Sequence, residues 1–260
     1  MVPAIELTRP ASHVALLRLN RPDRLNALDE EMVGALEQVF AALAGDRDVH
    51  VVVLTGAGRG FCAGLDVRGF GPSAPTPDAP ESEQLRFQER MAALPQALRA
   101  IPQPVIAAVN GACVGGGFAL ALACDLRLAS TTARFGNGAI LLGLTGGEMG
   151  MSYHLPRIVG ATIAADWMMT GRLVPAEEAE RRGLVNEVVA PDDLDARALA
   201  VAEHIAGLAP LGVQLTKQVL HENLDAPDLA TAVARENGYQ VRTAATTDSQ
   251  ERRGAWAAKG

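Results

Sequence analysis

Three short apolar runs limit most strongly how this chain can fold. They are residues 49–56 (VHVVVLTG), 104–111 (PVIAAVNG) and 125–130 (DLRLAS). Continuous runs rich in β-branched or small apolar side chains are typical of strands that are buried on both faces. A further strand is expected at 13–22, and residues 26–46 have apolar side chains at helical spacing. Strands and helices therefore alternate, which predicts an α/β core.

The strand signal fades near residue 155, and helical patterns follow. They cover residues 161–171, 175–183, 193–208 and 211–224. We therefore expect an α/β core over residues 1–195 and a helical C-terminal region over residues 196–260. Residues 69–84 are rich in Pro, Gly and Ser, which predicts a mobile loop inside the core region.

Charge and residue usage exclude several classes of protein. With 30 acidic and 23 basic side chains the net charge is −7, so neither nucleic acid nor an anionic membrane is an expected partner. Residues 105–123 are nearly uncharged, but a glycine triplet and the following Asp125 and Arg127 argue against a membrane span. Three cysteines without CxxC spacing and an N-terminus without a signal pattern predict a cytoplasmic protein. The five histidines lack metal-binding spacing, so no metal site is expected.

Gly115, Gly116 and Gly117 separate the strand at 104–111 from a helix that begins FALALACD. Free N–H groups at a helix start can stabilise a developing oxyanion, and glycine lets a substrate approach them. Close packing of the helix on a strand would also need glycine, and the triplet alone does not decide between the two. The other glycine-rich stretch, residues 55–64, matches neither the dinucleotide-binding fingerprint nor the Walker A motif.

Six segments resemble the crotonase (enoyl-CoA hydratase/isomerase) superfamily in order and spacing. They are LNRPDRLNAL (19–28), VVVLTGAGRGFCAGLDV (51–67), PVIAAVNGACVGGGFALALACDLRLAS (104–130), YHLPRIVG (153–160), MMTGRLVPAEEAERRGLVNEVV (168–189) and LAPLGVQLTKQVL (208–220). The resemblance implies a spiral of β-β-α units that binds acyl-CoA, with a helical C-terminal region that forms homotrimers or homohexamers. It also implies acyl-CoA or enoyl-CoA substrates and no separate cofactor.

The resemblance assigns site residues position by position. The two N–H groups that hold the thioester carbonyl in the family match Leu65 and Gly116. Positions along the CoA groove match Arg24, Leu25, Ala63, Asp66 and Val67, and Lys217 matches a position near the CoA phosphates. Two alternatives stay open, because Asp66 could cap its own turn and Lys217 could lie on a solvated helix.

Both catalytic glutamates of the family hydratases are replaced here, by Ala119 and Ala139. Alanine cannot move a proton, so the usual hydratase mechanism does not carry over. Glu148 matches a turn that holds a catalytic aspartate in related branches, although it could also be a helix N-terminal acid. We expect a hydratase/isomerase-type enzyme that forms an enolate in an oxyanion hole, with Glu148 as its single base. The alternative is a non-catalytic acyl-CoA-binding protein on the same fold.

Overall fold

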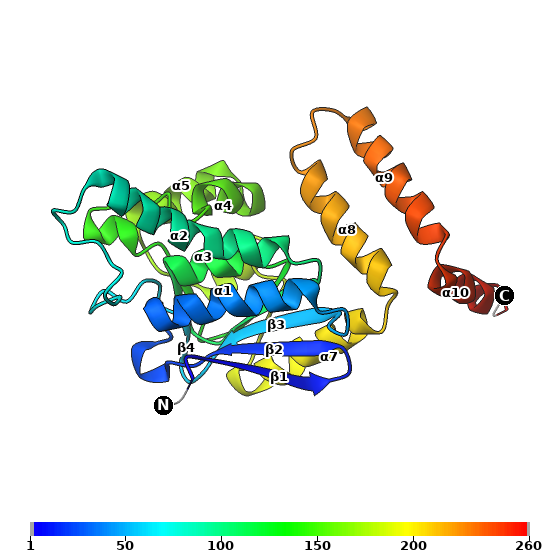
Figure 1. The fold of residues 1–260 in the computed structure, drawn as a ribbon, viewed down its shortest axis with the longest axis horizontal. Coiled ribbons are helices and arrows are strands. Elements are labelled where there is room, and N and C mark those ends of the chain that lie inside the picture. Colours follow the sequence, from blue (N-terminus) through cyan, green and yellow to red (C-terminus); the bar gives the residue numbers. More distant parts are fainter. Residues whose placement is uncertain (1–2, 259–260) are drawn as a thin grey trace.

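A computed structural model describes residues 3–258 of the chain (Figure 1). Its main sheet has the strand order β1-β2-β3-β5-β7-β10, in which only β1 runs antiparallel to its neighbour. These strands are β1 (Ile5–Ala11), β2 (Val14–Leu19), β3 (Val51–Gly56), β5 (Val105–Val109), β7 (Leu126–Ser130) and β10 (Glu187–Val189). The three apolar runs of the sequence are thus neighbouring parallel strands at the centre of the sheet, as predicted.

A second sheet has the order β4-β6-β8-β9. Its strands are β4 (Gly60–Cys62), β6 (Ala112–Val114), β8 (Arg134–Gly136) and β9 (Val174–Pro175). Each of β3, β5 and β7 is followed by one short strand of this second sheet and then by a helix. The chain therefore repeats a β-β-α unit, in agreement with the predicted spiral.

Helices cover the main sheet on both faces. The helices of the core are α1 (Glu30–Gly45), α2 (Glu81–Ala100), α3 (Gly116–Ala123), α4 (Met151–Val159), α5 (Ala161–Thr170), α6 (Ala176–Arg181) and α7 (Leu194–Ala206), with short 3-10 turns at Pro22–Arg24, Ala139–Leu142 and Pro191–Asp193. Val52 and Leu54 pack in the larger core, while Val51 and Val53 face the apolar side of α7. This alternation explains why the strand is apolar at every position.

The helix α7 lies mostly beyond the predicted division at residue 195, yet it packs on the main sheet. The helices that leave the body are α8 (Pro210–Asn223), α9 (Leu229–Ala244) and α10 (Thr247–Ala257), which we call the C-terminal arm (Figure 1). The outer ends of the two predicted regions, residues 1–2 and 259–260, lie outside the described residues. A role of the arm in trimerisation stays a prediction.

One local expectation needs correction. The predicted loop at 69–84 is shorter, because α2 begins at Glu81. Residues 105–123 form two strands and a helix, and no single helix within residues 3–258 is long and apolar enough to cross a membrane. The helical segments Pro191–Ala206 and Pro210–Asn223 are together long and apolar enough, but the chain bends by 105° between them.

Candidate functional site

The glycine triplet serves two different purposes. Gly117 is a packing residue, because a Cβ there would overlap the carbonyl oxygen of Cys62 and lie 2.6 Å from the Cys62 Cβ. Gly115 has φ +54° and ψ −124°, a conformation that glycine adopts far more readily than other residues. A Cβ on Gly115 would lie 3.4 Å from Oε1 of Glu148. The packing explanation therefore holds for Gly117, while Gly115 keeps open the space in front of a carboxylate.

Two backbone donors lie unpaired beside this space. Leu28 donates to the carbonyl of Gly64 at 2.7 Å, and the N–H of Asp66 donates back to Leu28 at 2.9 Å. Since a trans peptide is planar, the N–H of Leu65 points opposite to the Gly64 carbonyl, away from Leu28. Gly64 lies against the triplet, because a Cβ on it would be 3.3 Å from the nitrogen of Gly116. Within residues 3–258, neither the Leu65 nor the Gly116 N–H has a hydrogen-bond partner.

Glu148 lies in the turn before α4 and is half-buried. Its carboxylate makes no hydrogen bond or ion pair with any of the residues 3–258, and burial raises its pKa above the usual value. The helix N-cap is Gly150, with no capping side chain. Glu148 precedes α4 and makes no capping bond to it, so its hydrogen bonds do not decide between a base and a helix N-terminal acid favoured by the helix dipole. The geometry does show an unpaired carboxylate with a raised pKa near Gly115.

The turn that carries Glu148 is held firmly. The buried side chain of Asn137 donates to the carbonyl of Gly146 and accepts from the N–H of Ala139 at 3.1 Å. Met149 has φ +48°, a left-handed conformation that is strained for a residue with a side chain. Sequence reasoning missed both Asn137 and Met149, although an asparagine inside the FGNGA segment is a signal for side-chain-to-backbone bonding.

One cleft of about 230 Å³ brings together most of the predicted groove residues. Arg24, Leu25, Ala63, Leu65, Asp66 and Val67 all line it. Arg59 and Arg68 line it as well and were missed by sequence reasoning, although Arg59 lies inside the matched segment 51–67 and Arg68 directly follows it. Three guanidinium groups at one cleft suit an anionic ligand such as a phosphate.

Asp66 does cap its own turn. Its Oδ1 accepts the N–H of Arg68 at 3.1 Å, and its Oδ2 lies 3.0 Å from the guanidinium of Arg21. Burial raises the pKa of this carboxyl, but the bonds from Arg68 and Arg21 outweigh that effect and leave the pKa below its usual value. The capping alternative is therefore present in the structure, and a contact of Asp66 with CoA stays a prediction.

Lys217 is not on a solvated helix face, so that alternative is wrong. Its side chain is 7% exposed, and its Nζ lies 2.9 Å from Oδ2 of Asp125 and donates to the carbonyl of Gln103 at 2.9 Å. His221 Nε2 lies 3.0 Å from the other oxygen of Asp125. Lys217 therefore lies where α8 meets the body of the protein, and it is not among the residues that line the 230 Å³ cleft. Its ammonium group compensates the charge of the Asp125 carboxylate.

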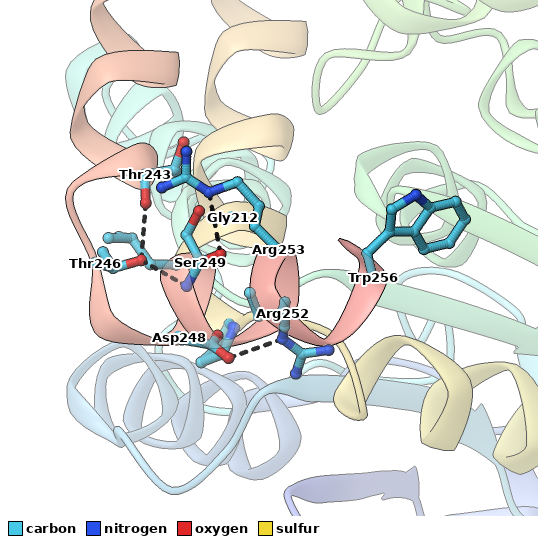
Figure 2. A pocket seen from close by; sticks show the side chains of 11 residues that line it. Gly212, Thr243, Thr246, Asp248, Ser249, Arg252, Arg253 and Trp256 are labelled. Atoms are coloured by element: carbon cyan, nitrogen blue, oxygen red, sulfur yellow. Dashed lines mark hydrogen bonds and ion pairs between the residues drawn. The ribbon is translucent and has the colours of Figure 1, made fainter. Parts of the chain in front are cut away.

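Other features of the described chain offer less chemistry. Ala119 and Ala139 are buried alanines. No cluster of three metal-binding side chains occurs among residues 3–258. A cavity of about 420 Å³ lies between α8 and α10, where Asp248 pairs with Arg252 and Trp256 points away from that pair (Figure 2). Its charged groups are paired or exposed, so this cavity lacks the unpaired carboxylate and the unpaired backbone donors that are found around Glu148.

Comparison with known proteins gives consistent likenesses. The family described as enoyl-CoA hydratase/isomerase matches residues 9–260. A probable enoyl-CoA hydratase of Mycobacterium leprae is 43% identical over 251 residues, which cover 95% of this chain and 84% of the relative. The (E)-benzylidenesuccinyl-CoA hydratase of Thauera aromatica is 42% identical over 222 residues, which cover 84% and 82%. The crystal structure of a probable enoyl-CoA hydratase/isomerase from Mycobacterium abscessus has a TM-score of 0.89 at 40% identity, covering 98% of this chain and 96% of that one.

Proposed function

The chain belongs to the enoyl-CoA hydratase/isomerase family and is an enzyme of that type, and from this we propose how its own residues act. The N–H groups of Leu65 and Gly116 form the oxyanion hole, and Glu148 is the single general base. The observation that supports this proposal most is the unpaired carboxylate of Glu148, whose Oε1 lies 3.4 Å from the Cβ position of Gly115. The resemblance to the crotonase superfamily, inferred from the sequence, is confirmed by the family match.

Isomerisation of an enoyl-CoA is the reaction that one carboxylate supports most directly. Glu148 takes a proton from the α-carbon of a 3-enoyl thioester, and the electron pair of the broken C–H bond moves to the carbonyl oxygen. The two N–H groups stabilise the resulting dienolate, since each such donor contributes about 3 kcal/mol to the transition state. The protonated Glu148 returns the proton to the γ-carbon, which moves the double bond into conjugation. The raised pKa of Glu148 suits a group that must both accept and release a proton.

Hydration is the second candidate, favoured by the hydratase names of the relatives. Glu148 would remove a proton from water as the water oxygen attacks the β-carbon. The electron pair of the double bond forms the enolate, and Glu148 then delivers its proton to the α-carbon. One carboxylate serves both steps in turn, because Ala119 and Ala139 provide no second one. We expect this route to be slower than isomerisation.

The CoA part of the substrate fits the cleft lined by Arg24, Leu25, Ala63, Asp66 and Val67, with its phosphates near the arginines. The loop expected at residues 69–84, which the structure ends where α2 begins at Glu81, borders the acyl end in this proposal. No cofactor besides the CoA thioester is required. The C-terminal arm carries exposed apolar side chains, including Leu220, Leu224 and Trp256, which support assembly into homotrimers or homohexamers. For Lys217 to contact the CoA phosphates, the ligand has to displace its buried partners, Asp125 and the Gln103 carbonyl.

The test compares the natural protein with Glu148→Gln and with Glu177→Gln, an exposed glutamate on α6. Isomerisation and hydration rates are measured with 3-enoyl-CoA and 2-enoyl-CoA substrates. Loss of a well-placed base lowers kcat by about 10²–10⁴-fold, while Glu177→Gln changes nothing. Equal rates in the natural protein and Glu148→Gln would remove Glu148 from the mechanism. Binding of acyl-CoA without turnover by the natural protein would favour the non-catalytic alternative.

A further inference from the structure

Arg21, which the mechanism above does not use, joins two segments next to the Leu65 donor. It follows β2, and its guanidinium lies 2.9 Å from Oδ2 of Asp29 and 3.0 Å from Oδ2 of Asp66. It also donates to the carbonyl of Ala27. The three charged side chains are 20%, 19% and 5% exposed, in the order Arg21, Asp29 and Asp66. The cluster is largely removed from water, so its charges are screened much less than a surface ion pair.

Arg21 contacts both of the segments that pair through Leu28, the start of α1 and residues 64–66. Asp29 is the N-cap of α1, because its Oδ1 accepts the N–H of Met32 at 2.9 Å. Asp66 ends the segment that is hydrogen-bonded to Leu28, the residue directly before Asp29. The guanidinium therefore holds the start of α1 and residues 64–66 together. A planar fork with several donors suits this task, since it can bind two carboxylates and a carbonyl at once.

The direction of the Leu65 N–H depends on this segment. The peptide between Gly64 and Leu65 is planar, so any rotation of residues 64–66 about Leu28 turns the donor. The hydrogen bonds to Leu28 resist this rotation at the backbone, and the pair with Arg21 resists it at the Asp66 side chain. The residues lining the cleft, in the part of the chain that the structure describes, do not include Arg21. Arg21 thus lies where it can orient the donor without touching CoA.

We propose that Arg21 is a positioning residue that keeps the Leu65 N–H directed at the thioester oxygen. This inference rests on the oxyanion hole proposed above. It predicts an effect on the rate of enolate formation rather than on CoA binding. A lysine at this position keeps the charge, but its compact ammonium does not reproduce the planar fork that reaches Asp29, Asp66 and the Ala27 carbonyl. We therefore expect Arg21→Lys to lose most of the positioning of the Leu65 N–H.

The first experiment measures kcat and KM for Arg21→Lys, with Arg90→Lys as the matched control. Arg90 forms a more exposed ion pair with Glu37, in which two guanidinium nitrogens donate to the carboxylate at 2.8 Å and 2.9 Å, between α2 and α1. Arg21→Lys lowers kcat by about 10²-fold, because a donor misplaced by about 1 Å costs that much, and leaves KM within about twofold. Arg90→Lys leaves both unchanged. A rise in KM with an unchanged kcat would make Arg21 a binding residue and overturn the proposal.

A second readout does not require turnover. A 3-oxoacyl-CoA bound with its thioester oxygen in an oxyanion hole releases its acidic α-proton to the solvent and shifts toward its enolate, which absorbs in the near ultraviolet. At saturating 3-oxoacyl-CoA, the natural protein shows the enolate band and Arg21→Lys shows a weaker one. Equal bands in the two proteins would overturn the role of Arg21 while leaving the oxyanion hole intact. No band in the natural protein would overturn the oxyanion hole, and the role of Arg21 with it.

Asp66→Asn provides the comparison if Arg21→Lys does not fold. It keeps the size of the side chain and an oxygen for the Arg68 N–H, and it removes the charge that faces Arg21. The expected result is again a lower kcat and a weaker enolate band. A folded Asp66→Asn protein with the natural kcat and the natural enolate band would overturn the proposal.

Discussion

Replacing Gly117 by alanine should destabilise the protein and damage its site, although the same change elsewhere in a helix is favourable. At Gly34, in the middle of α1, an added Cβ meets no atom within 4 Å, so Gly34→Ala gains about 1 kcal/mol from helix propensity. At Gly117 the added Cβ would lie 2.6 Å from Cys62 Cβ and 2.8 Å from its carbonyl carbon. Overpacking of this kind costs about 3 kcal/mol at the upper end of the usual range. After the same gain in propensity, Gly117→Ala is expected to lose about 2 kcal/mol.

The same overlap should reach the chemistry. The backbone of Cys62 lies in β4 and cannot leave the second sheet, so α3 must move away from it, and Gly116 moves with it. We expect kcat to fall by roughly 10- to 100-fold. Urea unfolding gives the free energy of unfolding for both variants, and the enoyl-CoA assay gives kcat. A Gly117→Ala protein as stable and active as Gly34→Ala would show that α3 and β4 are not in this close contact.

Four further results are expected. Burial raises the pKa of Glu148, so the pH profile of kcat/KM should fall on the acid side at a pH above the pKa of an ordinary glutamate. This acid-side fall should be absent from the pH profile of Glu148→Gln. The pKa of Glu148 is higher in the folded than in the unfolded protein, so its contribution to stability is complete below the unfolded pKa and is lost as the pH rises through the folded pKa. At neutral pH, Glu148→Gln should therefore be at least as stable as the natural protein, which a thermal melt would measure. Lys217→Met should lose about 3 kcal/mol in urea unfolding, since it leaves the buried Asp125 with only His221 as a side-chain partner; an unchanged midpoint would contradict the buried pair. Burial alone would raise the pKa of Asp125, but His221 and Lys217 lower it by more, so the folded pKa lies below the unfolded value of about 3.9. The stability that Asp125 contributes is therefore present above the unfolded pKa and is lost as the pH falls through the folded pKa. Asp125→Asn should remove this pH dependence of stability.

The central strands could be predicted because most of their residues are apolar, which is typical of strands buried on both faces. Val51, Val52, Val53 and Leu54 are apolar in succession, and the structure buries them on alternate faces. The helix α2 was missed although Met91, Leu94 and Leu98 have helical spacing, since its first half is polar and it contains Pro95. A proline and a loop-like composition upstream outweighed a weak apolar stripe.

Partners distant in sequence could not be read from local patterns. Lys217 lies on a helix of mixed polarity, and nothing near it indicates that Asp125, 92 residues earlier, is its counter-ion. The same holds for Arg21 and Asp66, which meet only when the first and second coils of the spiral are packed. Likewise, the left-handed conformation of Met149 follows from the closed turn around it, because methionine itself has no preference for that region.

The proposed parts of the site come from successive coils of the spiral, and they differ in how easily a mutation removes them. Leu65 follows β4 and Gly116 follows β6, and each contributes only a main-chain N–H. Glu148 follows β8 and contributes a side chain. No single nucleotide change deletes a main-chain N–H except one that introduces proline, whereas one change is enough to lose a carboxylate. A chain on this fold with alanine at positions such as 119 and 139 can therefore keep both main-chain donors and take its base from another position of the spiral, as we propose for Glu148.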